Sequence, residues 1–177
     1  RPPGGAAAGI TTTRLRLEPL VLDDAAFVVE LLNEPGWLQH IGDRGVRSIA
    51  DAQRYLIAGP LAMQAKHGLG VWRVTRRDDG MAVGVASLLR REQLPGADLG
   101  YALLARHEGR GYAREAAKAL LAWGQREQGL QRTLAVVSPV NTRSVVLLTR
   151  LGFRFEREFA WEAGADLVAL YACEAAV

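Results

Sequence analysis

The stretch Arg106-His107-Glu108-Gly109-Arg110-Gly111-Tyr112-Ala113-Arg114-Glu115-Ala116 decides the fold of this chain. It follows a strand-like segment, 98–104, and leads into a helix that we predict over 112–128. Glycines at the start of a helix let a ligand approach the backbone, and the first-turn amides have no partner inside the helix. Together with the helix dipole, these amides predict an anion site suited to a diphosphate. A plain left-handed turn before a helix is the alternative interpretation.

Two other phosphate-binding patterns fail at this stretch. A dinucleotide-binding fingerprint needs a third glycine three residues after Gly111, where this chain has Arg114. A P-loop needs lysine and then serine or threonine directly after its last glycine, where this chain has Tyr112. The stretch therefore predicts neither a dinucleotide fold nor a nucleotide-hydrolysing one.

The segments on either side of the glycines predict one α+β domain. Three consecutive strands with a turn at 78–80 indicate an antiparallel sheet before the glycines. After them, a strand over 132–138 leads to a helix that Asn141 caps and Gly152 ends, and a hairpin closes the chain. The order β-α-α-β-β-β-α-β-α-β-β predicts a central mixed, mostly antiparallel sheet flanked by helices. The segments are strands 11–17, 69–76, 81–90, 98–104, 132–138, 153–161 and 167–173, a helix capped by Asp23, and one from Ser48 that Gly59-Pro60 interrupts.

Length and composition exclude several classes of protein. The chain has 177 residues, 49% of them hydrophobic and 23% charged, the balance of one globular domain of about 150 residues. We expect a flexible tail over 1–10, without the apolar stretch of a secretion signal, and a single domain over 11–177. The longest apolar run is too short to cross a membrane. The net charge of +3 comes from basic residues interspersed with acidic ones, so we expect no nucleic-acid partner.

The lone cysteine and the scattered histidines limit the chemistry further. Cys173 excludes a disulfide framework, and a reducing cytoplasm is the simplest location for a single thiol. His67 and His107 have no second plausible ligand nearby in the sequence, so we expect no metal site.

Two motifs together resemble one enzyme family. Arg106-x-x-Gly109-x-Gly111 resembles the acetyl-CoA diphosphate loop of the GNAT N-acetyltransferases. Some thirty residues later, Asn141-x-x-Ser144 followed by Leu151-Gly152-Phe153 resembles the second signature of that family. The opening Leu-Arg-Leu and Leu99-Gly100-Tyr101 resemble the ribosomal-protein-alanine acetyltransferase branch, and the resemblance covers roughly residues 13–172.

The resemblance implies how acetyl-CoA is held. The backbone at Leu103 and Leu104 is expected to pair with the pantetheine arm, where strand 98–104 splays from strand 132–138. Asn141 is expected to bind the same arm, and its simpler role is that of a helix cap. Glu108 departs from the branch, which usually has a bulky aromatic residue there. The diphosphate is expected to lie at the loop Arg106, His107, Glu108, Gly109, Arg110, Gly111, Tyr112 and Ala113.

Acetyl transfer to an amine makes three demands. The ammonium must lose a proton, the thioester oxygen must be stabilised by an N–H near Leu103, and the leaving thiolate must gain a proton. Many family members use a tyrosine as the proton donor where this chain has Leu148. The resemblance implies that Ser144 serves instead, and the alternative is a surface hydroxyl bonded back to a carbonyl.

The sequence offers several candidates for the general base, whereas the resemblance points to a single general acid. Asp98 is our candidate, because acidic residues on this strand often serve in the family. Glu92 and His40 are alternatives, and so is a chain of water molecules, since a base within the reach of one water suffices.

We expect the acceptor to lie against the chemically varied loop 36–45, which contains Trp37, Gln39 and His40. Trp37 filling the core between the first helices is an equally good interpretation. The hypothesis is an acetyl-CoA-dependent N-acetyltransferase whose acceptor, a protein N-terminus or a small amine, attacks the thioester directly in a ternary complex. The alternative is a non-catalytic module that binds acyl-CoA. Hairpin 153–173 offers an edge strand for a homodimer.

Overall fold

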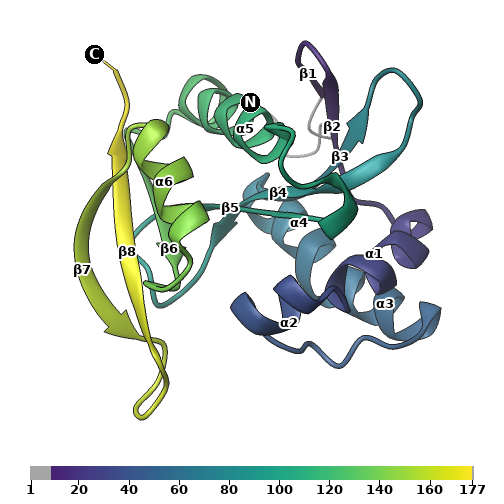
Figure 1. Cartoon of the computed structure of the whole chain (residues 1–177), viewed down its shortest axis with the longest axis horizontal. Coiled ribbons are helices and arrows are strands. Elements are labelled where there is room, and N and C mark those ends of the chain that lie inside the picture. Colours follow the sequence, from purple (N-terminus) through teal and green to yellow (C-terminus); the bar gives the residue numbers. More distant parts are fainter. Residues whose placement is uncertain (1–8, 177) are drawn as a thin grey trace.

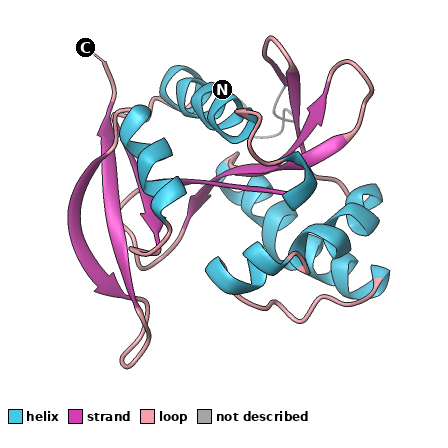
Figure 2. Ribbon diagram, viewed as in Figure 1, coloured by secondary structure: helices cyan, strands magenta, loops and turns pink. Residues whose placement is uncertain are grey.

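The computed structural model describes residues 9–176, which form an α+β fold with helices on both faces of one sheet (Figures 1 and 2). The predicted fold class is therefore confirmed. The strands are β1 (Ile10–Thr11), β2 (Leu15–Pro19), β3 (Gly70–Arg76), β4 (Ala82–Arg90), β5 (Ala97–Leu103), β6 (Arg132–Val137), β7 (Arg154–Ala160) and β8 (Leu167–Glu174). The helices are α1 (Ala25–Leu32), α2 (Pro35–His40), α3 (Ile49–Leu56), α4 (Ala62–His67), α5 (Tyr112–Glu127) and α6 (Thr142–Arg150).

The strands form one mixed sheet in the order β1-β2-β3-β4-β5-β6-β8-β7. Every neighbouring pair is antiparallel except β5 and β6, which are parallel. Strands β4 and β5 are paired along their whole length, from Gly84 opposite Leu103 to Arg90 opposite Ala97. Strands β5 and β6 are paired only where Asp98 meets Leu134. The sheet therefore opens between β5 and β6 beyond this point, as the resemblance implied.

Helices cover both faces of the sheet. Helices α5 and α6 lie on one face, and α1 to α4 gather on the other beside β3 and β4 (Figure 1). Small residues of α5, such as Ala116 and Ala117, are fully buried and let this helix lie close to the strands. Trp72 of β3 packs edge-to-face against Trp123 of α5, with the ring centroids 5.1 Å apart. This core fixes α5, and with it the glycine loop, against the sheet.

Several local predictions from turn and cap residues are confirmed. Gly80 has a φ of +73° in the turn between β3 and β4, and Gly152 has a φ of +97° after α6. The side chain of Ser48 accepts a hydrogen bond from the amide of Asp51 at the start of α3. Asn141 caps α6 in the same way by accepting from the amide of Ser144.

Four features differ from the predictions. The first strand is divided into β1 and β2, because Thr12 makes a tight turn in which its amide donates to the oxygen of Leu15. Strand β1 begins at Ile10, inside the tail that we expected over 1–10, and residues 1–8 lie outside the described part. Pro60 does not interrupt the helical run, since a π-helical segment over Ile57–Leu61 joins α3 to α4. Part of the predicted loop 36–45 is helix α2, with Pro35 in its first turn.

Strand β7 lies at the edge of the sheet, where a strand of a second copy of the chain could pair with it. This homodimer stays a prediction. In the part of the chain that the structure describes, the helices are too short or too polar to cross a membrane.

Candidate functional site

The opening between β5 and β6 exposes backbone groups of β5. In an antiparallel pair, alternate residues direct their N–H and C=O groups to the partner strand. The amide of Leu104 donates to the oxygen of Val83 at 2.9 Å, which sets the alternation. Tyr101 and Leu103 therefore direct their backbone groups toward β6, at positions where β6 is no longer paired with β5. These groups can bind an extended ligand as an added strand would.

The same alternation corrects one predicted binding residue. We expected both Leu103 and Leu104 to offer backbone groups to the pantetheine arm. The backbone N–H and C=O groups of Leu103 do face the opening, as expected. The amide of Leu104 is already bonded to β4, and its side chain is only 1% exposed. Leu104 therefore packs the core below the opening and does not offer an amide donor to it.

The glycine loop presents a row of backbone amides beside this opening. Gly109 and Gly111 both have left-handed backbones, with φ of +79° and +80°. No atom lies within 4 Å of the place where a Cβ of Gly109 would stand. The first backbone bond of α5 joins the amide of Glu115 to the oxygen of Gly111. The amides of residues 109–114, including that of Ala113, have no acceptor among the described residues and are available to an anion. The amides of His107 and Glu108, which we also expected at the diphosphate, are bonded to the oxygens of Leu104 and Ala105.

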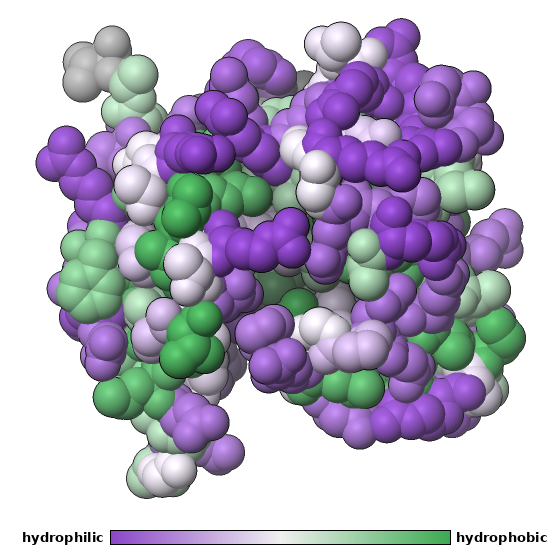
Figure 3. Space-filling view, in the orientation of Figure 1, coloured by the Kyte–Doolittle hydropathy of each residue, from purple (hydrophilic) through white to green (hydrophobic). Residues whose placement is uncertain are grey.

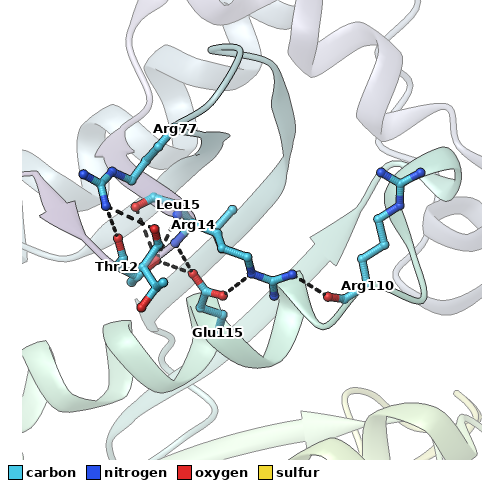
Figure 4. Close-up of polar contacts among 7 residues, drawn as sticks. Thr12, Arg14, Leu15, Arg77, Arg110 and Glu115 are labelled. Carbon is cyan, nitrogen blue, oxygen red and sulfur yellow. Dashed lines mark hydrogen bonds and ion pairs between the residues drawn. The ribbon is translucent and has the colours of Figure 1, made fainter.

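The start of α5 is tied to β2 by a polar network (Figure 4). The guanidinium of Arg14 donates to a carboxylate oxygen of Glu115 at 2.7 Å and to the backbone oxygen of Arg110 at 2.9 Å. It also stacks over the ring of Tyr112, 4.6 Å from the centroid. The hydroxyl of Thr12 and the amide of Arg14 both donate to the other oxygen of Glu115. The network therefore fixes the end of the loop and the first turn of α5 against the turn before β2.

We predict that Glu115→Gln destabilises the protein by about 1–2 kcal/mol at pH 7, because an amide group would face hydrogen-bond donors. Burial raises the pKa of Glu115, but hydrogen bonds from Thr12 and Arg14 outweigh it and leave the pKa below its ordinary value. This stabilisation is complete above the ordinary pKa and is lost as the pH falls through the lowered one. Urea unfolding at pH 7 and pH 4 measures it, with the exposed Glu158→Gln as control. Equal stabilities of Glu115→Gln and the control at pH 7 would contradict the prediction.

The charged residues around the loop have different partners. Arg106 forms an ion pair with Glu30 of α1, so its guanidinium is directed to the helical layer. The side chain of Arg110 points away from the network around Glu115 (Figure 4). Glu108 accepts a hydrogen bond from Arg143 of α6 at 3.2 Å. The carboxylate that departs from the family pattern is therefore paired across the opening.

His107 is a buried residue of the loop that lacks polar partners. His107 is only 5% exposed, and neither nitrogen of its ring has a hydrogen-bond partner among the described residues. Burial lowers the pKa of His107, and the nearby arginines, Arg106 first among them, lower it further. The imidazole is therefore neutral near pH 7 and supports the loop by packing.

Helix α6 brings Asn141 and Ser144 to the other side of the opening. The side-chain oxygen of Asn141 accepts from the amide of Ser144 at 3.4 Å, which leaves the NH₂ group of Asn141 for a ligand. The Ser144 hydroxyl is not bonded back to a carbonyl of the described residues, and its side-chain neighbour is the hydroxyl of Tyr101, with which it makes a hydrogen bond. The hydroxyl of Tyr101 donates to the backbone oxygen of Ser144 at 3.3 Å. We missed this function of Tyr101 in the sequence, where only its place in the Leu99-Gly100-Tyr101 motif was a signal.

Asp98 lies at the beginning of β5 and does not join these groups. Asp98 is only 3% exposed, and both of its carboxylate oxygens accept hydrogen bonds from Arg91. Burial raises the pKa of Asp98, while the hydrogen bond from Arg91 opposes the increase. The carboxylate is covered, and both of its oxygens are held by Arg91, which is the arrangement of a buried ion pair. The role of Asp98 as the general base stays a prediction.

The predicted acceptor residues all lie on α2, at the edge of the helical layer. Trp37 packs against the cluster formed by α1 and α3, and its buried indole nitrogen lacks a partner among the described residues. Gln39 and His40 are exposed. The core interpretation of Trp37 is thus the one that its packing supports, and the binding roles of all three stay predictions.

A cavity of about 450 Å³ lies beside the network of Figure 4, on the side of β2 and β3. Its arginines already have partners: Arg76 pairs with Asp79, and Arg77 donates to the backbone oxygens of Thr12 and Thr13. The opening between β5 and β6 lies on the other side of α5 and is the better candidate site. No cluster of three or more histidine, cysteine, aspartate or glutamate side chains suited to a metal occurs within residues 9–176.

Comparisons with known proteins agree with this geometry. Residues 14–154 match the model of the acetyltransferase (GNAT) domain family. The uncharacterized N-acetyltransferase YoaA of Bacillus subtilis is 26% identical over 161 residues, 88% of this chain and 89% of its own. A Bordetella pertussis structure described as GnaT-family is 29% identical, with a TM-score of 0.78, over 94% of this chain and 99% of its own. A structure of RimL, a ribosomal L7/L12 α-N-protein acetyltransferase, in complex with coenzyme A has a TM-score of 0.81 at 18% identity, over 94% and 98%.

The chain belongs to the GNAT acetyltransferase family, and it is an N-acetyltransferase that uses acetyl-CoA. The described residues fit this donor. The left-handed Gly109 leaves open space above the loop amides, which suits a diphosphate. The free backbone edge of β5 suits the amides of a pantetheine arm, and the NH₂ group of Asn141 can add a hydrogen bond.

Proposed function

We propose that the protein transfers the acetyl group directly to a primary amine, with both substrates bound at the opening between β5 and β6. One observation carries the proposal: Tyr101 holds the first turn of α6 beside β5, on which Leu103 directs its free amide toward the opening. This contact supports a single site for the Ser144 hydroxyl and the free edge of β5. When bound, acetyl-CoA supplies the thioester that the amine attacks.

Each residue in the proposal has one task. The amides of Gly109 to Ala113 and the edge of β5 hold the donor in an extended form. The amide of Leu103 stabilises the negative charge that grows on the carbonyl oxygen. The hydroxyl of Ser144 gives its proton to the departing sulfur, and the proton that the attacking amine loses passes through water to restore the hydroxyl. Since Cys173 is buried in β8, no thiol of this chain takes part in the transfer.

The proposed acceptor is an α-amino group at a peptide N-terminus, and the reaction takes place in the cytoplasm. The acceptor proposal is supported by structural similarity to RimL, which is described as a ribosomal L7/L12 α-N-protein acetyltransferase. The opening is also accessible from outside. Figure 3 shows this face hollowed between the half formed by α6, β7 and β8 and the half formed by α1 to α4. The location is supported by the single, unpaired thiol.

Release of coenzyme A from acetyl-CoA over a panel of amines tests the function. The panel contains peptides with free N-termini, the same peptides with blocked N-termini, polyamines and amino acids. We expect turnover with free peptides and none with blocked ones. Turnover confined to small amines would overturn the proposed acceptor, and a covalently acetylated protein after mixing with the donor alone would overturn direct transfer.

We predict that Ser144→Ala lowers kcat by about 100-fold, the lower end of the usual range for the loss of general acid catalysis. The KM for acetyl-CoA is expected to stay within about twofold, because the cap at Asn141 uses the backbone amide of residue 144 and not its hydroxyl. Steady-state kinetics across pH 6–9 measures both constants. Thr149→Ala, at the other end of α6, is the matched control for loss of a hydroxyl. An unchanged kcat in Ser144→Ala would contradict the role of the serine.

A further inference from the structure

We infer that Arg143 is a ligand for the diphosphate of acetyl-CoA, and that Glu108 holds its guanidinium at the loop until the donor binds. The inference rests on the donor site proposed above. It concerns an ion pair that crosses the opening of the sheet. Glu108 belongs to the loop between β5 and α5, and Arg143 belongs to the first turn of α6.

The position of the guanidinium carries the argument. Its Nη1 atom lies 3.2 Å from a carboxylate oxygen of Glu108, the residue directly before Gly109. The space above Gly109 is open, and the loop amides from Gly109 onward have no partners among the described residues. Arg143 therefore stands next to the place where the phosphates are expected. Polar side chains lie over the hollow on this face of the molecule (Figure 3).

Two neighbouring arginines are held elsewhere, whereas the side chain of Arg110 in the loop points away from the network (Figure 4) and forms no ion pair among the described residues. Arg106 is paired with Glu30, and Arg14 is bonded to Glu115 and to the oxygen of Arg110. Arg143 is the cation that is paired with the loop from the α6 side. Its side chain is 74% exposed, so it can change partners without leaving a tightly packed position.

The energetics favour an exchange of partners. An exposed ion pair contributes little to stability, because water screens the charges and the side chains lose freedom. A guanidinium on a phosphate makes a charge-assisted bond that is often bidentate. A carboxylate next to a diphosphate repels it, and this repulsion falls when Glu108 turns into solvent, where it is already 43% exposed. Glu108 thus competes with the donor for Arg143.

Titration calorimetry with coenzyme A tests the inference without any turnover. We expect Arg143→Gln to weaken binding by about tenfold and Glu108→Gln to strengthen it by about two- to fivefold. In the Glu108→Gln background, Arg143→Gln is expected to lower the affinity for coenzyme A by more than tenfold. In that background Arg143 binds the diphosphate without first giving up its ion pair with Glu108, so its contribution to binding is larger. Arg150→Gln, at the other end of the same helix, removes the same charge and is expected to change the affinity by less than twofold.

Two further arms make the outcomes decisive. Dephospho-coenzyme A lacks the 3′-phosphate but keeps the diphosphate, so the loss in Arg143→Gln is expected to persist with it. Disappearance of the loss would overturn the assignment to the diphosphate. Equal affinities of Arg143→Gln and Arg150→Gln, or weaker binding by Glu108→Gln, would overturn the inference as a whole. If the unmodified protein does not bind coenzyme A, the donor site itself is refuted. Circular dichroism of each variant shows that the fold is intact.

Discussion

Gly109→Val is expected to weaken the binding of coenzyme A by at least about 100-fold while the protein stays folded. The backbone of Gly109 has a φ of +79°, a conformation that a β-branched residue adopts only with strain of about 1–3 kcal/mol. No described atom lies within 4 Å of the point where the Cβ atom would stand, so the valine meets no neighbour in the free protein. It would occupy the space above the loop amides that the proposal gives to the diphosphate.

The control for this experiment is a second glycine of the same kind. Gly129 has a φ of +65° after the end of α5, and its Cβ position is also open. Gly129→Val therefore adds the same type of strain at the far end of the helix, where no ligand is expected. Calorimetry of both variants and their thermal unfolding separate strain from steric exclusion. A Gly109→Val protein that binds as tightly as Gly129→Val would refute the loop as the diphosphate site.

Arg91→Met is expected to have the largest effect on stability, a loss of about 3 kcal/mol at pH 7. The substitution leaves the carboxylate of Asp98 buried and without its cation, and breaking such a pair costs several kcal/mol. Arg91 also lies over the ring of Trp161, 4.5 Å from the centroid, and methionine keeps part of that packing. Arg90→Met is the control, because Arg90 is the exposed neighbour in the sequence.

The pH dependence identifies the cause of this loss. Burial already raises the pKa of Asp98, and without Arg91 the pKa of the folded state rises further above that of the unfolded chain. The penalty is complete above the folded-state pKa and is relieved as the pH falls through it, because the neutral acid tolerates burial. Urea unfolding at pH 7 and pH 5 is expected to show a smaller difference from the unmodified protein at pH 5. The same difference at both values would contradict the explanation.

Asp98→Asn separates structure from catalysis at the same position. Asparagine can still accept one hydrogen bond from Arg91, so we expect most of kcat to remain. A loss of 100-fold or more with an intact fold would support Asp98 as the general base.

The sequence by itself determined the elements whose signals are local. The glycines of the loop, the cap at Asn141 and the stop at Gly152 each specify a backbone conformation from their own side chains or lack of one. They lie where we predicted them, with the predicted helices attached. The ordered set of motifs also pointed to the GNAT family, which the match over residues 14–154 confirms.

Only the tertiary structure decided which groups meet, because such contacts join residues far apart in the chain. The structure shows that Asp98, the expected base, is paired with Arg91, and that the amide of Leu104, an expected donor, is bonded to Val83. The sequence spacing between Glu108 and Arg143 does not show that the two side chains face each other. Their contact depends on where β5 and β6 separate, and that is a property of the whole sheet.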